Sequence, residues 1–173
     1  VGTGSEVGEL LLTDRRLPLV SATGSCRMGR RVAEIVGRRM GRSLLELGGN
    51  NGVVVMDDAN LDLAVRAITF AAVGTAGQRG TTAPRLFVQK GIASEMTSRL
   101  KRAYASVTIG DPLEAKTLMG PLIDDEAVGA MKAALDQARK EGGEILYGGR
   151  TLDRSGHFVE PTLVRARGDL PMM

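Results

Sequence analysis

The chain has 173 residues, a length that suits one domain or two smaller parts, and its 43% hydrophobic and 25% charged residues are typical of a folded globular protein. The net charge is only +3, and one cysteine with one histidine excludes an internal disulfide and argues against a structural zinc site. There is no apolar run of about 18 residues and no signal-peptide pattern, so we expect no membrane partner and a cytoplasmic location.

The positive charge is concentrated in one segment of the chain. This segment contains a cluster of arginines, namely Arg27, Arg30, Arg31, Arg38, Arg39 and Arg42. A nucleic-acid-binding surface usually adds aromatic residues or a known motif to such a cluster, and aromatic residues are only 3% of this chain. The pattern therefore favours a solvated helix face and no nucleic-acid partner, with a basic nucleic-acid-binding module as the alternative.

The first elements expected are a short helix, a strand, a longer helix and a second strand. Apolar spacing predicts helices over residues 4–13 and about 26–40, and apolar runs predict strands over residues 17–22 and 43–47. Gly41 should stop the second helix. The residues expected to be buried in these two helices are Val7, Leu10 and Leu11, then Met28, Val32, Ile35, Val36 and Met40.

The rest of the chain continues the alternation of strands and helices. Strands are predicted over residues 52–56, 85–89, 144–147 and 157–164, helices over about 61–72, 92–104 and 125–141, and an extended segment over 107–112. The strand over 52–56 is entirely apolar and is expected to be covered on both faces, with Asp57 and Asp58 capping the helix that follows. This alternation predicts an α/β protein with a largely parallel sheet.

The first candidate site is the turn from Gly24 to Gly29, between a strand and a helix. Free backbone N–H groups and the helix dipole favour an anion such as a pyrophosphate at such a turn. The spacing differs from the usual G-x-G-x-x-G, so a plain strand-to-helix turn with Ser25 as the helix cap is an equally good interpretation.

The second candidate is Glu46, which lies among apolar residues near the end of its strand and before Gly48 and Gly49. Burial would raise the pKa of this carboxyl group, which suits a general base near neutral pH. The alternative is a strand-end glutamate that is paired with one of the many arginines.

The third candidate is the glycine-rich loop over residues 74–82. Its backbone N–H groups could bind a substrate oxyanion. Taken alone, this loop is better explained as an ordinary mobile connection.

Together these motifs resemble the aldehyde dehydrogenase superfamily. The matching segments are Ala22-Thr23-Gly24-Ser25, Leu45-Glu46-Leu47-Gly48-Gly49-Asn50, Gly77-Gln78-Arg79, Gly120-Pro121-Leu122, Tyr147-Gly148-Gly149 and Val159-Glu160-Pro161-Thr162-Leu163. Their order and spacing fit over essentially the whole chain. Residues 41–51 and 72–79 are similar to the antiquitin-like branch, the α-aminoadipic semialdehyde (piperideine-6-carboxylate) dehydrogenases.

The resemblance implies a fold and a division into domains. Residues 1–47 would be the end of a Rossmann-type NAD-binding domain, and residues 48–173 would be most of an α/β catalytic domain, incomplete at its C-terminus. Because the chain lacks an initiator methionine and ends without a closing element, we expect an internal fragment that is unstable alone. The full-length protein would be a dimer or tetramer of identical subunits.

The resemblance also implies roles for particular residues. Residues near the cofactor NAD would be Gly24, Ser25, Gly29, Arg30, Arg31, Glu46 and Leu47. Glu46 would be the general base that activates water, position 80 would carry the nucleophile, and the backbone N–H of Thr81 would help to hold the oxyanion. The reaction implied is oxidation of a small aldehyde, such as aminoadipic semialdehyde, to a carboxylic acid through a thioester.

This sequence departs from the family pattern where the cysteine nucleophile is expected, because position 80 is glycine. A glycine cannot form a thioester, and Cys26 lies 54 positions earlier in the segment assigned to the cofactor domain. Pro84 is a second departure, since the branch favours a basic residue there. We therefore expect this chain to be inactive, and the alternative is a non-catalytic relative that keeps the fold for binding or assembly.

Overall fold

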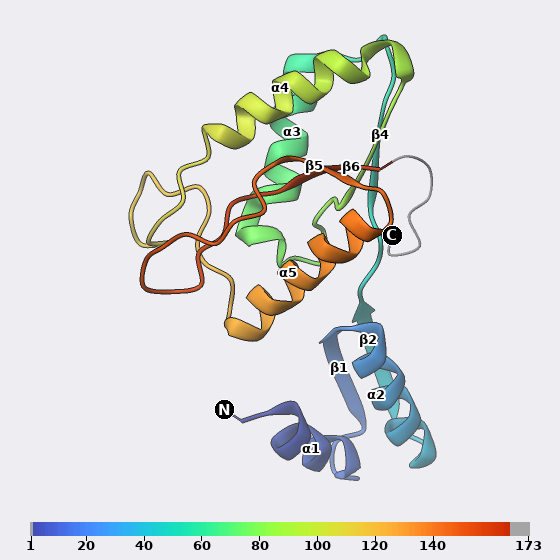
Figure 1. Ribbon diagram of the computed structural model, residues 1–173. Coiled ribbons are helices and arrows are strands. Elements are labelled where there is room, and N and C mark those ends of the chain that lie inside the picture. Colours follow the sequence, from blue (N-terminus) through green and yellow to red (C-terminus); the bar gives the residue numbers. More distant parts are fainter. Residues whose placement is uncertain (1, 167–173) are drawn as a thin grey trace. The chain divides into compact units, whose positions relative to one another are not determined.

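The structure is a computed structural model that describes residues 2–166 (Figure 1). It divides into two compact units, residues 1–49 and 50–173. This division lies two residues after the expected domain boundary, and each unit has its own hydrophobic core.

The first unit contains a two-stranded parallel sheet and its helices. The elements are η1 (Gly4–Gly8), α1 (Glu9–Thr13), β1 (Leu19–Gly24), α2 (Cys26–Arg38) and β2 (Arg42–Leu47). Strands β1 and β2 pair in parallel over their full lengths, from Leu19 opposite Arg42 to Gly24 opposite Leu47. The two strands therefore end at the same edge of the sheet.

The core of this unit is smaller than the apolar pattern predicts. Its buried hydrophobic side chains are Leu12, Val32 and Val36. The predicted face of the first helix is wrong: a π-helical turn precedes α1, and this change of period leaves Leu10 and Leu11 exposed and buries Leu12. Helix α2 ends at Arg38, and Met40 is 93% exposed with a positive φ of 58°, so it continues neither the helix nor its buried face.

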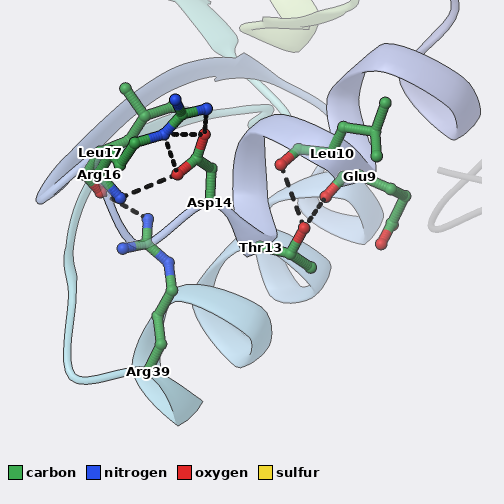
Figure 2. Close-up of polar contacts among 7 residues, drawn as sticks. All are labelled: Glu9, Leu10, Thr13, Asp14, Arg16, Leu17 and Arg39. Carbon is green, nitrogen blue, oxygen red and sulfur yellow. Dashed lines mark hydrogen bonds and ion pairs between the residues drawn. The ribbon is translucent and has the colours of Figure 1, made fainter.

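Arg39 ties the end of α2 to the turn after α1. Its guanidinium donates from Nε to the Leu12 carbonyl (2.8 Å) and from Nη2 to the Leu17 carbonyl (2.7 Å). Figure 2 shows this arginine reaching the turn, in which Arg16 donates to the Asp14 carboxylate from its backbone N–H and from Nε and Nη2 of its guanidinium. At least this member of the arginine cluster has a structural role.

The second unit is built on a parallel β-α-β arrangement. Its elements are β3 (Gly52–Val55), α3 (Leu61–Val73), η2 (Gly74–Gly77), β4 (Arg85–Val88), η3 (Lys90–Ile92), α4 (Ala93–Ala105), α5 (Asp125–Lys140), β5 (Glu144–Tyr147) and β6 (Leu163–Arg165). Strands β3 and β4 are parallel, whereas β5 and β6 are antiparallel. The buried core consists of Val55, Ile68, Val73, Met96, Leu100, Tyr104, Met119, Leu122 and Val159.

Several local predictions for this unit are confirmed. Asp124 caps α5 by accepting a hydrogen bond from the Ala127 N–H (2.8 Å), and Met96, Leu100 and Tyr104 form the buried face of α4. Helix α5 stops before Gly142, which takes a positive φ of 88°.

Other predictions for this unit are wrong. Asn60, rather than Asp57 or Asp58, caps α3, because its side chain accepts from the Leu63 N–H at 3.1 Å. Strand β3 is covered on one face only, since the Val54 side chain is 68% exposed. In place of the strand expected over 157–164, the structure has only the short strand β6 (Leu163–Arg165) and an isolated β-bridge between Thr151 and Val159.

Across residues 2–166, no helix has the length and apolar character needed to cross a membrane.

Candidate functional site

In the first unit, the candidate cofactor residues gather where β1 and β2 end. Thr23 lies opposite Glu46 and Gly24 opposite Leu47 in the parallel register. Ser25 follows β1 and caps α2, because its hydroxyl oxygen accepts from the Met28 N–H at 3.1 Å. Since the N–H groups of the first helical turn have no acceptor inside the helix, this edge presents free donors next to a strand end.

Gly29 explains how α2 comes so close to β2. A Cβ atom on this residue would overlap the δ-methyl groups of Leu47. With glycine at this position, the Leu47 side chain can lie directly against the first turn of the helix, and a larger residue would require that side chain to move. Gly24, Ser25, Gly29, Glu46 and Leu47 are therefore brought together, as the sequence predicts, at one edge of this unit.

The two candidate arginines differ in their contacts. Arg31 donates to Glu9 (3.0 Å) and lies 3.7 Å from Glu34, and the hydrogen bond to Glu9 raises the pKa of the Arg31 guanidinium. Arg30 is exposed and forms no ion pair with another described residue. Of the two, Arg30 is the one whose charge is available to a ligand.

Glu46 does not have the environment that the sequence suggests. Its side chain is exposed, so the expected burial is not found, and it forms no ion pair with an arginine in the described part of the chain. The strand alternates its side chains between two faces, and in β2 only Leu45 is partly buried. The carboxylate is therefore open at the strand end.

In the second unit, the loop that contains position 80 runs from the end of α3 to the start of β4. It opens with η2, in which Thr75 and Ala76 take positive φ values of 51° and 53°. The following turn is closed by the Thr82 N–H, which donates to the Arg79 carbonyl at 3.0 Å. The Thr82 hydroxyl oxygen accepts from the Arg79 N–H (3.2 Å) and its O–H donates to the Gly77 carbonyl (3.0 Å).

Gly80 and Thr81 occupy the centre of this turn, and both are exposed. No described residue accepts a hydrogen bond from either of their backbone N–H groups. An ideal Cβ atom at position 80 meets no other atom within 4 Å, and Gly80 does not need a positive φ. The backbone could therefore carry a larger side chain at position 80 without rearrangement.

Two further residues hold the loop, and sequence reasoning did not single them out for this role. The Asn51 amide nitrogen donates to the carbonyls of Gly80 and Thr82, each at 2.8 Å. Gln78 accepts from the Ile123 N–H (3.0 Å) and donates to the Pro121 carbonyl (3.4 Å). The only signal in the sequence was that both residues lie inside or next to recognisable motifs.

A depression of about 320 Å³ lies beside this loop, and Thr75, Gln78, Thr117 and Pro121 contribute to its walls. Among residues 2–166, no three His, Cys, Asp or Glu side chains come close enough together to hold a metal ion. The polar groups of the loop are its backbone N–H and C=O groups, the Gln78 amide, the Arg79 guanidinium and the threonine hydroxyls.

Comparison with known proteins decides the family. The model of the aldehyde dehydrogenase family matches residues 1–169. The chain belongs to the aldehyde dehydrogenase family. It is 49% identical over 161 residues to bovine α-aminoadipic semialdehyde dehydrogenase, which covers 93% of this chain and 30% of the bovine protein. It is 45% identical over 166 residues to aldehyde dehydrogenase family 7 member B4 of Arabidopsis thaliana, which covers 96% and 33% respectively.

Solved aldehyde dehydrogenase structures confirm the α/β fold. Betaine aldehyde dehydrogenase of Staphylococcus aureus, in complex with NAD+, has a TM-score of 0.93 at 31% identity, covering 99% of this chain and 35% of that one. Lactaldehyde dehydrogenase of Escherichia coli has a TM-score of 0.93 at 35% identity, covering 99% and 36%. The chain thus spans about a third of the length of the aldehyde dehydrogenases that it matches.

Proposed function

We propose that the protein to which these residues belong is built to oxidise an aldehyde to a carboxylic acid with NAD, and that aminoadipic semialdehyde is its substrate. The 49% identity to bovine α-aminoadipic semialdehyde dehydrogenase over 93% of this chain carries this proposal. The cytoplasm as its location and a dimer or tetramer as its assembly belong to the same proposal. In this proposal, residues 1–47 belong to the domain that binds the cofactor, and residues 48–173 belong to the catalytic domain that carries the nucleophile position.

The edge formed by β1 and β2 suits a dinucleotide. Free N–H groups at the start of α2, after Gly24 and Ser25, can bind a phosphate oxygen, and the positive end of the helix dipole favours the negative charge. Arg30 and Arg31 are close in sequence to this turn, and Leu47 is 39% exposed at the strand end, where it can contact the nicotinamide. NAD, when bound, accepts the hydride that leaves the substrate.

The remaining roles belong to the protein's own groups. A nucleophile at position 80 adds to the carbonyl carbon, because a free aldehyde is a poor hydride donor until a nucleophile has added to it. The Thr81 N–H, which has no acceptor among the described residues, can stabilise the oxygen that becomes negative. Glu46 takes a proton from the water that cleaves the thioester.

Gly80 blocks the first step of this reaction, the addition of a nucleophile to the carbonyl carbon. Glycine has no thiol, and Cys26, whose Sγ donates to the Gly48 carbonyl at 3.4 Å, belongs to the other unit. We therefore propose that the chain with glycine at position 80 binds cofactor without turnover.

The test compares the natural-length protein with its Gly80→Cys and Gly80→Ser variants. The measurement is NADH formation from aminoadipic semialdehyde and NAD, with cofactor binding followed separately by fluorescence. We expect turnover from Gly80→Cys alone, because the serine hydroxyl is far less ionised than a thiol near neutral pH. Equal turnover with glycine at position 80 would remove the claim of inactivity.

A second candidate function is a non-catalytic relative that keeps the fold for binding or assembly, and Gly80 is the observation that favours it. It predicts that Gly80→Cys binds NAD and stays silent with aminoadipic semialdehyde and with other small aldehydes. If Gly80→Cys is active, adding Glu46→Gln to it tests the role proposed for Glu46. The proposed general base predicts that this double variant forms the thioester and hydrolyses it slowly.

A further inference from the structure

Asn51 makes an unusual double contact with the loop that contains position 80. Its side-chain nitrogen is 2.8 Å from the Gly80 carbonyl oxygen and 2.8 Å from the Thr82 carbonyl oxygen. Because both partners can only accept, the NH2 end of the amide must face them, and both of its hydrogens are used. One side chain therefore fixes two of the carbonyl groups around position 80.

This contact also determines where the Thr81 N–H points. The peptide unit that joins Gly80 to Thr81 is planar and trans, so its C=O and N–H groups point in opposite directions. When Asn51 holds the Gly80 carbonyl on its own side, the Thr81 N–H is turned to the opposite side. That N–H has no acceptor in the described part of the chain.

The hydrogen bond from Asn51 to the Thr82 carbonyl also fixes the orientation of the peptide that joins Thr82 to Ala83. The Thr82 carbonyl faces Asn51, and the Ala83 N–H of the same peptide donates to the Ala71 carbonyl at 3.2 Å. The peptides on both sides of the Thr81–Thr82 bond are thus held, and the turn cannot rotate one of them without breaking a hydrogen bond.

Asn51 itself is held by the sheet. It precedes β3, and its carbonyl accepts from the N–H of Arg85, the first residue of β4, at 3.3 Å. The Arg85 guanidinium also donates to the Asn50 carbonyl. The amide of Asn51 is therefore presented from the ordered start of two paired strands, 29 positions away in sequence from Gly80.

We propose that Asn51 is a positioning residue, which orients the Gly80–Thr81 peptide so that its N–H is directed at the group reacting at position 80. This inference rests on the proposed function, because it takes position 80 as the nucleophile site. If the role of Asn51 were purely structural, its hydrogen bonds would stabilise the loop but would not change the reactivity of a side chain at position 80.

The experiment measures the pKa of a thiol at position 80. The parent is the natural-length protein with Gly80→Cys and every other cysteine, including Cys26, replaced by serine, so that it carries a single thiol, and the probe is iodoacetamide. The alkylation rate is followed against pH, because only the thiolate reacts. Three variants are then added to this parent: Asn51→Ala, Asn51→Gln and Asn60→Ala.

Asn60→Ala is the matched control. It makes the same chemical change in the same unit, where it removes the cap of α3 at Leu63 and no contact to the loop. It therefore lowers stability without touching the peptide between Gly80 and Thr81. Circular dichroism checks that each variant is folded, and Asn51→Ser, too short to reach both carbonyls, replaces Asn51→Ala if that variant unfolds.

We expect the thiol of the parent to titrate about one unit below the ordinary cysteine pKa of about 8.5, because a directed N–H stabilises the thiolate. Asn51→Ala should return it to the ordinary value, Asn51→Gln should restore part of the shift, and Asn60→Ala should change nothing. An unshifted thiol in the parent, or a shifted thiol that Asn51→Ala leaves unchanged, overturns the inference. If the thiol pKa shift depends on Asn51 but the Gly80→Cys protein does not oxidise aldehydes, this inference stands and the proposed function is wrong.

Discussion

At the scale of single residues, glycines in this chain serve opposite purposes. Gly80 lies in open space with a backbone that any residue can adopt, whereas Gly148 has a φ of +74° and a Cβ atom there would overlap the Pro161 carbonyl. At Gly29 a Cβ atom would overlap only the Leu47 side chain, which would have to move. The loss of a side chain at position 80 is therefore a chemical change and not a steric requirement.

This difference predicts the result of one substitution at two positions. Gly80→Ala should leave stability unchanged or raise it by about 0.4–1 kcal/mol, because alanine restricts the unfolded chain without strain in the folded one. Gly148→Ala should lower it by about 1–2 kcal/mol or more, from left-handed strain and the backbone overlap. Urea unfolding of the second unit measures both, and an equal loss at the two positions would contradict the open geometry at Gly80.

At the scale of elements, the first unit depends on polar contacts between its helices. Arg31 in α2 donates through Nε and Nη2 to the two carboxylate oxygens of Glu9 in α1, at 3.0 and 3.1 Å. Both side chains are exposed, so this bond is open to solvent and to changes of pH. It joins the short α1 to a helix that would otherwise contact it mainly through Leu12.

The pH dependence of this contact has a definite sign. The hydrogen bond from Arg31 holds the pKa of Glu9 below its ordinary value of 4.5, so the folded state binds fewer protons than the unfolded state near that pH. The stability that Glu9 adds is thus fully present above about pH 4.5 and is lost as the pH falls through the lower folded pKa. Glu9→Gln should flatten the acid side of the stability profile of the first unit.

The measurement for this prediction is the urea midpoint from roughly pH 3 to pH 7, a range that includes the ordinary pKa values of carboxyl groups. Glu6→Gln is the control, because Glu6 accepts from the Thr3 hydroxyl and forms no ion pair with a described residue. A flattened profile in Glu6→Gln, or an unchanged one in Glu9→Gln, would assign the acid sensitivity to other groups.

At the scale of the whole molecule, the two units have cores of very different size. Among the described residues, the core cluster of the first unit has three buried hydrophobic side chains and that of the second has nine. Because the stability of a small domain scales with the apolar surface that it buries, the first unit should unfold before the second.

Substitutions in the two cores should therefore act separately. Val36→Ala should destabilise the first unit by about 2 kcal/mol, and Leu100→Ala the second by about 2–5 kcal/mol. Hydrogen exchange read by mass spectrometry can follow residues 2–49 and 50–166 independently. Protection lost in both units after Val36→Ala alone would show that they unfold as one cooperative body.

Much of the local structure was predictable from the sequence, because helices, strands and caps depend on residues a few positions apart. Asp124 caps α5 and Ser25 caps α2 as expected, and the alternation of strands and helices indicated the α/β class. The order of the family motifs also led to the correct family, which the match over residues 1–169 confirms.

The tertiary structure alone decided which faces are covered and which distant groups meet. An apolar strand does not reveal that Val54 is exposed, and an acidic residue among leucines does not reveal that Glu46 is open at a strand end. The contact of Asn51 with Gly80 joins residues 29 positions apart. Such contacts arise when packed elements bring separate segments together, so no periodicity or cap within the local sequence could have predicted them.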